Sequence, residues 1–275
     1  NSLTNEGNIT VSGTATTSYY AGGVVGNATA ELTSLTNSGA VTYTGTATDA
    51  YYIGGVAGYV TAGSFTDNVN SGELYINEAM YDLDWGGVIG ASAVKVERCE
   101  NKGSLSINEA ITKANIGGVL GKLEAESILD CENSGQLHFQ ENFLINNTCV
   151  IGGVVAMAER GTKSIANCYN SGAIEYVGSC YYAGRSSVSG NANMILGGVV
   201  GFALSELVLE CHNASTAILN IEGKVSGNGN IATATRAPIE KMTAIGAVIG
   251  ARGGSKALLG TADLVNTENC PNKGN

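Results

Sequence analysis

Short stretches in which apolar and polar residues alternate recur along the whole chain, with glycine and asparagine between them. In one repeat, Leu105 and Ile107 alternate with serines, and residues 127–131 form a second apolar stretch. Alternation with a period of two predicts strands, and the residues between them suit tight turns. Each repeat is therefore expected to form three short strands: one after an Asn-x-Gly motif, one at a Gly-Gly-Val motif and one that runs into the next Asn.

Two motifs repeat in phase about every 32 residues. The first is an apolar residue followed by Gly-Gly-Val, another apolar residue and Gly. Its copies begin at Ala21, Ile53, Trp85 and Ile116, and looser copies begin at Ile151, Leu196 and Ile245. The second is Asn-x-Gly, with the asparagine at Asn5, Asn37, Asn70, Asn101, Asn133, Asn170 and Asn272 and a diverged copy at Asn213.

A single repeat of this length cannot bury its own apolar side, whereas stacked repeats enclose a continuous core. Short connections make each repeat one coil, and consecutive coils then pair in parallel. Crossovers between parallel strands are nearly always right-handed. The sequence thus predicts an all-β, right-handed parallel β-helix of about seven coils of about 32 residues, which forms a single solenoid domain over residues 1–275.

The repeated asparagine has a structural use in such a coil. Coils stack at ~4.8 Å, so each side-chain amide can donate a hydrogen bond to the asparagine of the next coil. Asparagine, and more easily the glycine two residues later, also tolerates the left-handed backbone of a tight corner. We therefore expect a structural ladder along the axis, made by Asn5, Asn37, Asn70, Asn101, Asn133, Asn170, Asn213 and Asn272.

Two neighbouring positions of the repeat suggest a ligand site. The apolar residue directly before each Gly-Gly is expected to point inwards, so the residue before it points outwards. That outward position holds Tyr20, Tyr52, Asp84 and Asn115 in successive coils. Aromatic rings beside a carboxylate and an amide suit the apolar faces and hydroxyls of a sugar. The alternative is an aromatic pair across neighbouring coils that only stabilises the sheet.

Insertions lengthen one corner of the repeat toward the C-terminus. The spacing from Asn to the next Gly-Gly grows from 17 residues after Asn5 to 33 after Asn213. Insertions confined to one face of a solenoid often build its binding face. Residues 178–194 and 222–243 are therefore candidate binding loops, with Tyr181, Tyr182 and Arg185 as candidate ligand-binding residues, and the alternative is a surface loop without a ligand.

The charge of the chain restricts its possible binding partners, and the spacing of its cysteines restricts its possible metal and redox chemistry. The net charge is −10, and residues 1–94 contain eight acids but no Lys or Arg. Such a surface repels phosphate backbones and anionic membrane surfaces, so nucleic acid is not an expected partner. The longest apolar run has 11 residues, so membrane insertion of this segment is not expected either. Seven cysteines without a CxxC pair indicate neither a zinc site nor a redox motif. Five of them stand two residues before an Asn motif, where we expect buried free thiols.

No catalytic constellation, metal site or cofactor site is evident. Asp82 and Asp84 would lie ~6.6 Å apart on one strand face, a spacing that inverting glycosidases also use between their carboxylates. Exposed acids without a function are the simpler interpretation. A lyase acting on uronates also needs a cation to neutralise the substrate carboxylate, and only Arg185, Arg236 or Lys241 in the late insertions would serve.

The two motifs together resemble the GLUG repeat family of bacterial surface proteins, most nearly at residues 118–121, with similar copies at 23–26, 55–58 and 87–90. Departures lie at Ala156 and at residues 246–247. The resemblance implies an exported, adhesin-like role at the cell surface and no catalytic residue.

We therefore expect a non-catalytic, extracellular or cell-surface segment of a longer bacterial protein, whose leader is not present in this chain and which has flanking domains. It would bind carbohydrate or a host or cell-surface protein. The alternatives are a polysaccharide lyase or glycoside hydrolase, by analogy of fold alone, and a structural spacer or stalk.

Overall fold

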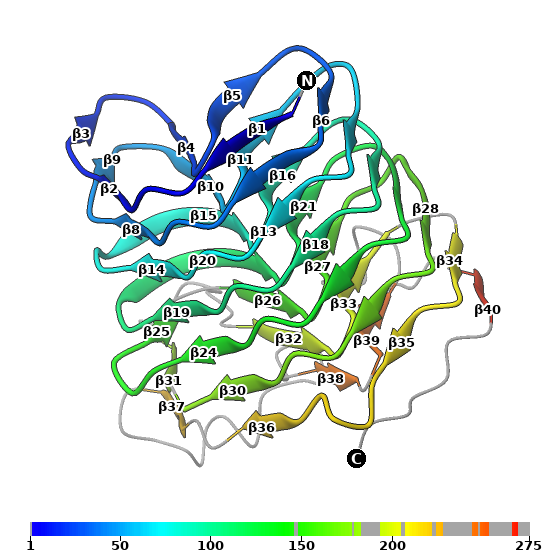
Figure 1. Ribbon diagram of the computed structural model, residues 1–275. Coiled ribbons are helices and arrows are strands. Elements are labelled where there is room, and N and C mark those ends of the chain that lie inside the picture. Colours follow the sequence, from blue (N-terminus) through cyan, green and yellow to red (C-terminus); the bar gives the residue numbers. More distant parts are fainter. Residues whose placement is uncertain are drawn as a thin grey trace.

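The chain winds into an all-β parallel solenoid of about five turns, and no helix is present among the residues that the structure describes. The computed structural model describes residues 2–145, 148–177, 179–182, 193–204, 207–221, 224–227, 244–246, 248–252 and 266–268. Coils stack from the N-terminal one downwards in Figure 1, and each strand pairs in parallel with its equivalent in the neighbouring coils. The parallel β-helix architecture predicted from the repeat is confirmed.

Each coil contributes strands to five long sheets, more than the three strands that the sequence predicted. Sheet A holds the strands that carry the Asn motif: β1 (Leu3–Asn5), β7 (Leu35–Asn37), β13 (Val69–Asn70), β18 (Glu100–Asn101), β23 (Glu132–Asn133), β29 (Tyr169–Asn170) and β35 (His212–Asn213). Sheet B follows the motif: β2 (Ile9–Val11), β8 (Val41–Tyr43), β14 (Leu74–Ile76), β19 (Leu105–Ile107), β24 (Leu137–Phe139), β30 (Ile174–Tyr176) and β36 (Leu219–Ile221). A small sheet C pairs β3 (Thr14–Ala15) with β9 (Thr46–Ala47).

A turn between two sheets lies at the second glycine and the valine of the Gly-Gly-Val motif, so the motif is not one strand as expected. Sheet D precedes it: β4 (Tyr19–Gly22), β10 (Ala50–Gly54), β15 (Met80–Gly86) and β20 (Ala110–Gly117), after which the sheet continues both as β25 (Leu144–Ile145), β31 (Ser179–Tyr182) and β37 (Lys224–Gly227) and as β26 (Thr148–Gly152), β32 (Asn193–Gly197) and β38 (Ala244–Gly246). Sheet E follows it: β5 (Val25–Ala28), β11 (Ala57–Val60), β16 (Ile89–Ser92), β21 (Leu120–Leu123), β27 (Val155–Ala158), β33 (Val200–Ala203) and β39 (Ile249–Arg252). Sheet F closes the coil: β6 (Leu32–Thr33), β12 (Phe65–Thr66), β17 (Val96–Glu97), β22 (Glu126–Leu129), β28 (Thr162–Ala166), β34 (Leu207–Leu209) and β40 (Asn266–Glu268).

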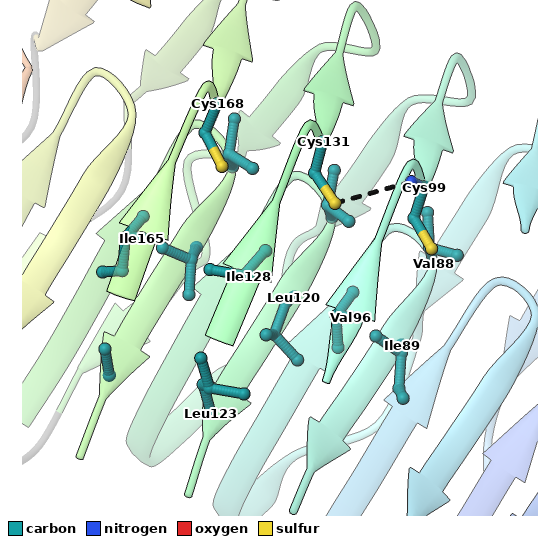
Figure 2. Packing of buried hydrophobic residues seen from close by; sticks show 14 of the residues in the cluster. Val88, Ile89, Val96, Cys99, Leu120, Leu123, Ile128, Cys131, Ile165 and Cys168 are labelled. Atoms are coloured by element: carbon teal, nitrogen blue, oxygen red, sulfur yellow. Dashed lines mark hydrogen bonds between the residues drawn. The ribbon is translucent and has the colours of Figure 1, made fainter. Parts of the chain in front are cut away.

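The interior consists of two apolar cores. One lies between sheets E and F, where Ile89 and Leu120 face Val96 and Ile128 (Figure 2). The other lies between sheets B and D and contains the buried indole of Trp85. As predicted, the residue directly before Gly-Gly is buried in this second core in each coil for which its burial is described: Ala21, Ile53, Trp85, Ile116, Ile151 and Leu196.

The Asn ladder runs between the two cores. Each described amide donates one hydrogen bond to the side chain of the next Asn, over 2.7–2.9 Å, from Asn5 through Asn37, Asn70, Asn101, Asn133 and Asn170 to Asn213. In the first six of these residues the same nitrogen also donates to the carbonyl two residues later, as in Asn101 to Gly103, 2.8 Å. The predicted ladder is confirmed for these seven residues, and Asn272 lies outside the described residues.

The Gly-Gly turn presses against this ladder from the other side of the coil. A Cβ on Gly55 would lie 2.4 Å from Asn70 Cγ, and one on Gly118 would lie 2.4 Å from Asn133 Cγ. Real Cβ atoms do not approach other heavy atoms this closely, so the second glycine is required by close packing. The ladder and the turn together form a narrow waist that separates the two cores.

The left-handed corner lies three residues before six of the motif asparagines, so the backbone role assigned to the Asn-x-Gly motif was wrong. Positive φ values of 47–57° recur at Ser34, Asp67, Arg98, Asp130, Asn167 and Glu210. The motif glycine is needed for another reason, since a Cβ on Gly103 would lie 1.9 Å from the carbonyl oxygen of Gly72 in the preceding coil.

The cysteine column lies at the edge of the first core. Cys99, Cys131 and Cys168 are buried free thiols at equivalent positions of three coils, as expected (Figure 2). Cys99 donates its backbone N–H to the Cys131 sulfur over 3.4 Å. Burial raises the pKa of the Cys131 thiol well above its usual value, so this thiol stays protonated at neutral pH.

Candidate functional site

The outward side chains on either side of the Gly-Gly turn form the candidate site, which we call the outer corner. On sheet D, strand pairing aligns Tyr20 with Tyr52, Tyr52 with Asp84, and Asp84 with Asn115. On sheet E, pairing aligns Tyr59 with Ala91, and Ala91 with Lys122. The outer corner comprises Tyr20, Tyr52, Tyr59, Asp84, Asn115, Lys122 and the two carboxylates that bind this lysine, Glu124 and Glu159.

The four sheet D residues predicted to form the site do lie in one row outside the two cores, but they differ in exposure. Tyr20 is 39% exposed, whereas Asp84 and Asn115 are only 6% and 3% exposed. The expectation of an open surface row is therefore wrong for the last two. A Cβ on Gly90 would lie 2.9 Å from the Asp84 carbonyl oxygen, and one on Gly121 would lie 3.0 Å from the Asp84 carbonyl carbon. The backbone of sheet E thus packs against this part of sheet D and covers it.

Three tyrosine rings stack at the N-terminal end of the corner. Tyr20 and Tyr52 lie 5.1 Å apart between ring centroids with planes 8° apart, and Tyr52 and Tyr59 lie 5.0 Å apart at 14°. Because the rings are nearly parallel, they cover part of one another's faces, and the phenol edges remain for contact with a ligand. Tyr20, in the first strand of sheet D, also stacks on Tyr59, with ring centroids 6.1 Å apart and planes 8° apart, so each of the three rings contacts both others.

Charged groups lie directly beside the rings. The Tyr59 hydroxyl donates to Glu124 Oε2 over 2.6 Å, and Lys122 Nζ lies 3.3 Å from Glu124 and 3.1 Å from Glu159. Burial and the neighbouring Asp84 carboxyl raise the pKa of Tyr52 to about 12, and burial and the Glu124 hydrogen bond raise the pKa of Tyr59 further. Both phenols therefore stay protonated at neutral pH and can donate hydrogen bonds.

Asp84 is the buried carboxyl of the corner. Asn115 Nδ2 donates to Asp84 Oδ1 over 2.7 Å. Burial raises the pKa of Asp84 to about 7, although the Asn115 hydrogen bond and the charge of Lys122 lower it. Burial lowers the pKa of Lys122, but the carboxylates of Asp84, Glu159 and Glu124 outweigh this and raise it above its usual range.

Further along the axis the same two rows become apolar. Val150 and Ile195 continue the sheet D row, and Phe202 continues the sheet E row. With Ala156 they form a separate buried cluster outside the two cores. The alanine that replaces the closing glycine of the motif is therefore a member of this apolar end, and the polar residues of the two aligned rows end at Asn115 and Lys122.

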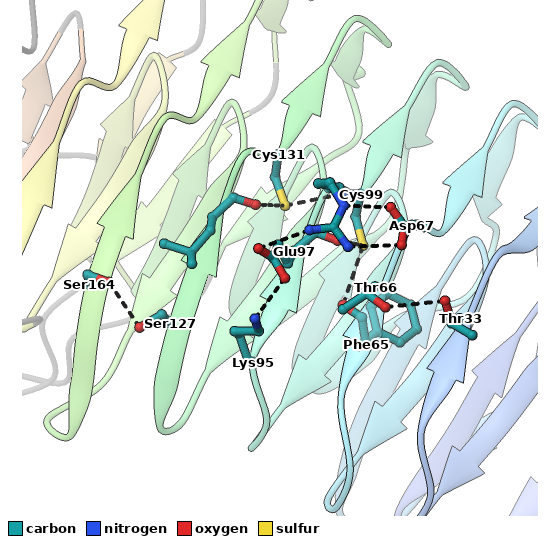
Figure 3. A network of polar contacts seen from close by, with 12 residues as sticks. Thr33, Phe65, Thr66, Asp67, Lys95, Glu97, Cys99, Ser127, Cys131 and Ser164 are labelled. Carbon is teal, nitrogen blue, oxygen red and sulfur yellow. Dashed lines mark hydrogen bonds and ion pairs between the residues drawn. The ribbon is translucent and has the colours of Figure 1, made fainter.

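Other predicted candidates lie apart from this site or outside the description. Asp82 shares the outward row of β15 but pairs with Lys113 over 3.1 Å. For Tyr181 and Tyr182 only the backbone in β31 is described, and Arg185 lies outside the described residues. The insertions at 178–194 and 222–243 also fall largely outside them, so they remain predictions. A second polar network, in which Arg98 binds Asp67 and Glu97, lies on sheet F (Figure 3).

Sequence reasoning missed Tyr59, Lys122, Glu124 and Glu159. A signal for the first two existed, because Tyr59 and Lys122 each directly follow the closing glycine of the Gly-Gly-Val motif. What the repeat does not show is that this position faces the position two residues before Gly-Gly. That pairing across the turn depends on the angle between sheets D and E.

Comparison with known proteins does not indicate a function, so a functional assignment rests on the geometry of the site. No family model, curated protein or solved structure matches the chain. No helix in the described part of the chain is long and apolar enough to cross a membrane. Within the same described ranges, no group of three or more His, Cys, Asp or Glu side chains is arranged to hold a metal ion.

Proposed function

We propose that this chain is a non-catalytic, adhesin-like segment of an exported bacterial surface protein, related to the GLUG repeat family, and that it binds glycans at the outer corner. The observation that carries the proposal is the stack of Tyr20, Tyr52 and Tyr59 beside hydrogen-bonding side chains. Phenol edges and carboxylates match the hydroxyl groups of a sugar, and the exposed part of the Tyr20 ring offers a surface for its C–H groups.

The finer architecture belongs to the same proposal. We infer a right-handed solenoid of seven coils, with insertions at 178–194 and 222–243 that extend the binding face and contribute Tyr181, Tyr182 and Arg185. Flanking domains of a longer chain would display it outside the cell, where carbohydrate or a cell-surface protein is the partner.

The test is glycan binding by a double variant, Tyr20→Ala with Tyr52→Ala, against a matched control. The control is Tyr75→Ala with Tyr169→Ala, which removes two outward tyrosines from sheets B and A. On a glycan array, we expect the corner variant to bind at least ~10-fold more weakly and the control to bind like the unmodified protein. Circular dichroism establishes that both variants are folded. Equal binding by the unmodified protein and the corner variant would remove the site.

A spacer is the second candidate, because mutual stacking of tyrosines and a continuous Asn ladder are also what a stiff rod requires. A protein that binds no glycan or cell-surface partner but resists bending would favour this role. A lyase or hydrolase rests on analogy of fold alone, and the cations that a lyase would need, Arg185, Arg236 and Lys241, lie outside the described residues. Turnover of acidic polysaccharides that is lost when these three are changed to Ala would establish it.

A further inference from the structure

We propose that the outer corner selects glycans that carry protonated amino groups over neutral and acidic ones. This inference rests on the glycan-binding function proposed above and adds the chemical class of the sugar. It is carried by the balance of charge at the tyrosine stack and by which charged groups reach the surface.

The first step is the count of charges around the rings. Two carboxylates, Glu124 and Glu159, bind the single ammonium of Lys122. A second lysine, Lys113, is matched by Asp82. Glu124 and Glu159 thus share one ammonium group between two carboxylates, and residues 1–94 supply no Lys or Arg to the corner, because this part of the chain contains none. Asp84 adds a further acidic group when it is ionised.

The second step is to compare how far a ligand can reach the charged groups of the corner. The side chains of Glu159 and Glu124 are 43% and 26% exposed, whereas that of Lys122 is 21% exposed and already has two carboxylate partners. A ligand that approaches the ring edges therefore meets carboxylate oxygens more readily than the ammonium group. These oxygens only accept hydrogen bonds, and the phenol oxygens of the tyrosines can also accept them.

The third step is the match with sugar chemistry. A protonated amine donates up to three hydrogen bonds and carries a positive charge, so its bonds to carboxylates are charge-assisted. A uronate or sulfated sugar would bring a further negative charge to a corner where two carboxylates already share one lysine. An N-acetylated sugar has no charge, and it would bind through the ring and hydroxyl contacts alone.

The experiment compares three oligosaccharides of equal length by calorimetry at mildly acidic pH: a glucosamine oligomer, the fully N-acetylated oligomer and a galacturonate oligomer. We expect the unmodified protein to bind the glucosamine oligomer at least ~10-fold more tightly than the acetylated one and the galacturonate most weakly. The preference should shrink in high salt, because exposed charges are screened.

The variant Glu124→Gln with Glu159→Gln should bring the two glucosamine-based ligands within about threefold of each other. Glutamine still accepts the Tyr59 hydrogen bond, and thermal unfolding checks that the fold persists. The matched control, Glu100→Gln with Glu132→Gln, removes two aligned carboxylates from sheet A and should leave the preference unchanged.

The outcomes separate this inference from the function on which it rests. Equal binding of the amino and acetylated oligomers, or tighter binding of galacturonate, would overturn the selectivity and leave glycan binding in place. An equal loss of preference in the sheet A control would show diffuse attraction by the acidic surface and would also overturn it. If none of the three oligomers binds and the glycan array is blank, the proposed function itself fails.

Discussion

Asp84 is an acidic residue held away from water on the outer side of the solenoid, where sheet E covers it. Its carboxyl has one described hydrogen-bond donor, Asn115, and no ion pair within 4.0 Å is described for it. Burial without a directly bonded cation favours the neutral acid. The free energy of unfolding should therefore change with pH as this one group gains or loses its proton.

The pH dependence of unfolding tests this. In the unfolded chain the Asp84 carboxyl loses its proton near pH 3.8, but in the folded protein it keeps the proton to about pH 7. The folded state binds the proton more tightly, so this contribution to the free energy of unfolding is complete below pH 4 and is lost as the pH rises to about 7. We expect Asp84→Asn, which mimics the neutral acid, to remove this slope and to be more stable than the unmodified protein at pH 8 by a few kcal/mol.

Urea unfolding at pH 4, 6 and 8 measures the effect. Asp82→Asn is the matched control, because Asp82 lies two residues earlier on the same strand but is part-exposed and paired with Lys113. The control should retain the slope. If Asp84→Asn retains it too, Asp84 is not the group that titrates.

The ladder makes a second prediction for a single residue. Asn101 accepts a hydrogen bond from Asn70 and donates to Asn133 and to the Gly103 carbonyl, all in a fully buried position. Asn101→Ala leaves these three buried groups without their partner and should lower the free energy of unfolding by about 3–5 kcal/mol. Asn77→Ala, at an exposed position, should change it by less than ~0.5 kcal/mol. Similar effects in the two variants would show that the ladder does not stabilise the fold.

At the level of the strands and turns, stacking decides which glycines are required. Gly103 follows the Asn of its motif in the turn between β18 and β19, and a Cβ there would lie 1.9 Å from the Gly72 carbonyl oxygen. Gly7 occupies the same motif position in the first coil, and a Cβ there would meet only Asn5 Oδ1 at 3.8 Å. The difference arises because Gly103 has a preceding coil against it.

Alanine at these two positions should therefore lower the free energy of unfolding by very different amounts. Gly103→Ala must push two coils apart, and we expect a loss of at least ~3 kcal/mol or a failure to fold. Gly7→Ala should cost less than ~1 kcal/mol. Thermal unfolding of the two variants makes the comparison, and a stable Gly103→Ala protein would contradict the close approach of coils at this turn.

For the molecule as a whole, each coil contacts only its neighbours, so stability should vary along the axis. Leu3 in the first coil is 56% exposed, whereas Leu35, its partner in the second coil, is 1% exposed. Hydrogen exchange measured by mass spectrometry should show faster exchange in residues 2–34 than in residues 69–133. Uniform protection along the chain would mean that the solenoid opens as one cooperative unit.

The repeat alone predicted much of this architecture. The in-phase motifs indicated parallel stacking, the inward apolar position before Gly-Gly and the Asn ladder, because every coil places the same residue types in the same environment. It misplaced the left-handed corner, since Ser34, Asp67 and Arg98 share no residue type that marks a positive φ. It also predicted too few strands, because two-residue strands such as β18 are too short to show alternation.

The sequence by itself thus determined how the coils stack and which residues lie in register along the axis, since both follow from the period of the repeat. Only the tertiary structure decided which rows face each other. Tyr52 meets Tyr59, and Lys122 joins Glu124 and Glu159, because the chain folds back at the Gly-Gly turn and brings the outer sides of sheets D and E together. That angle depends on how the waist packs against the turn, and it is a property of all the coils together.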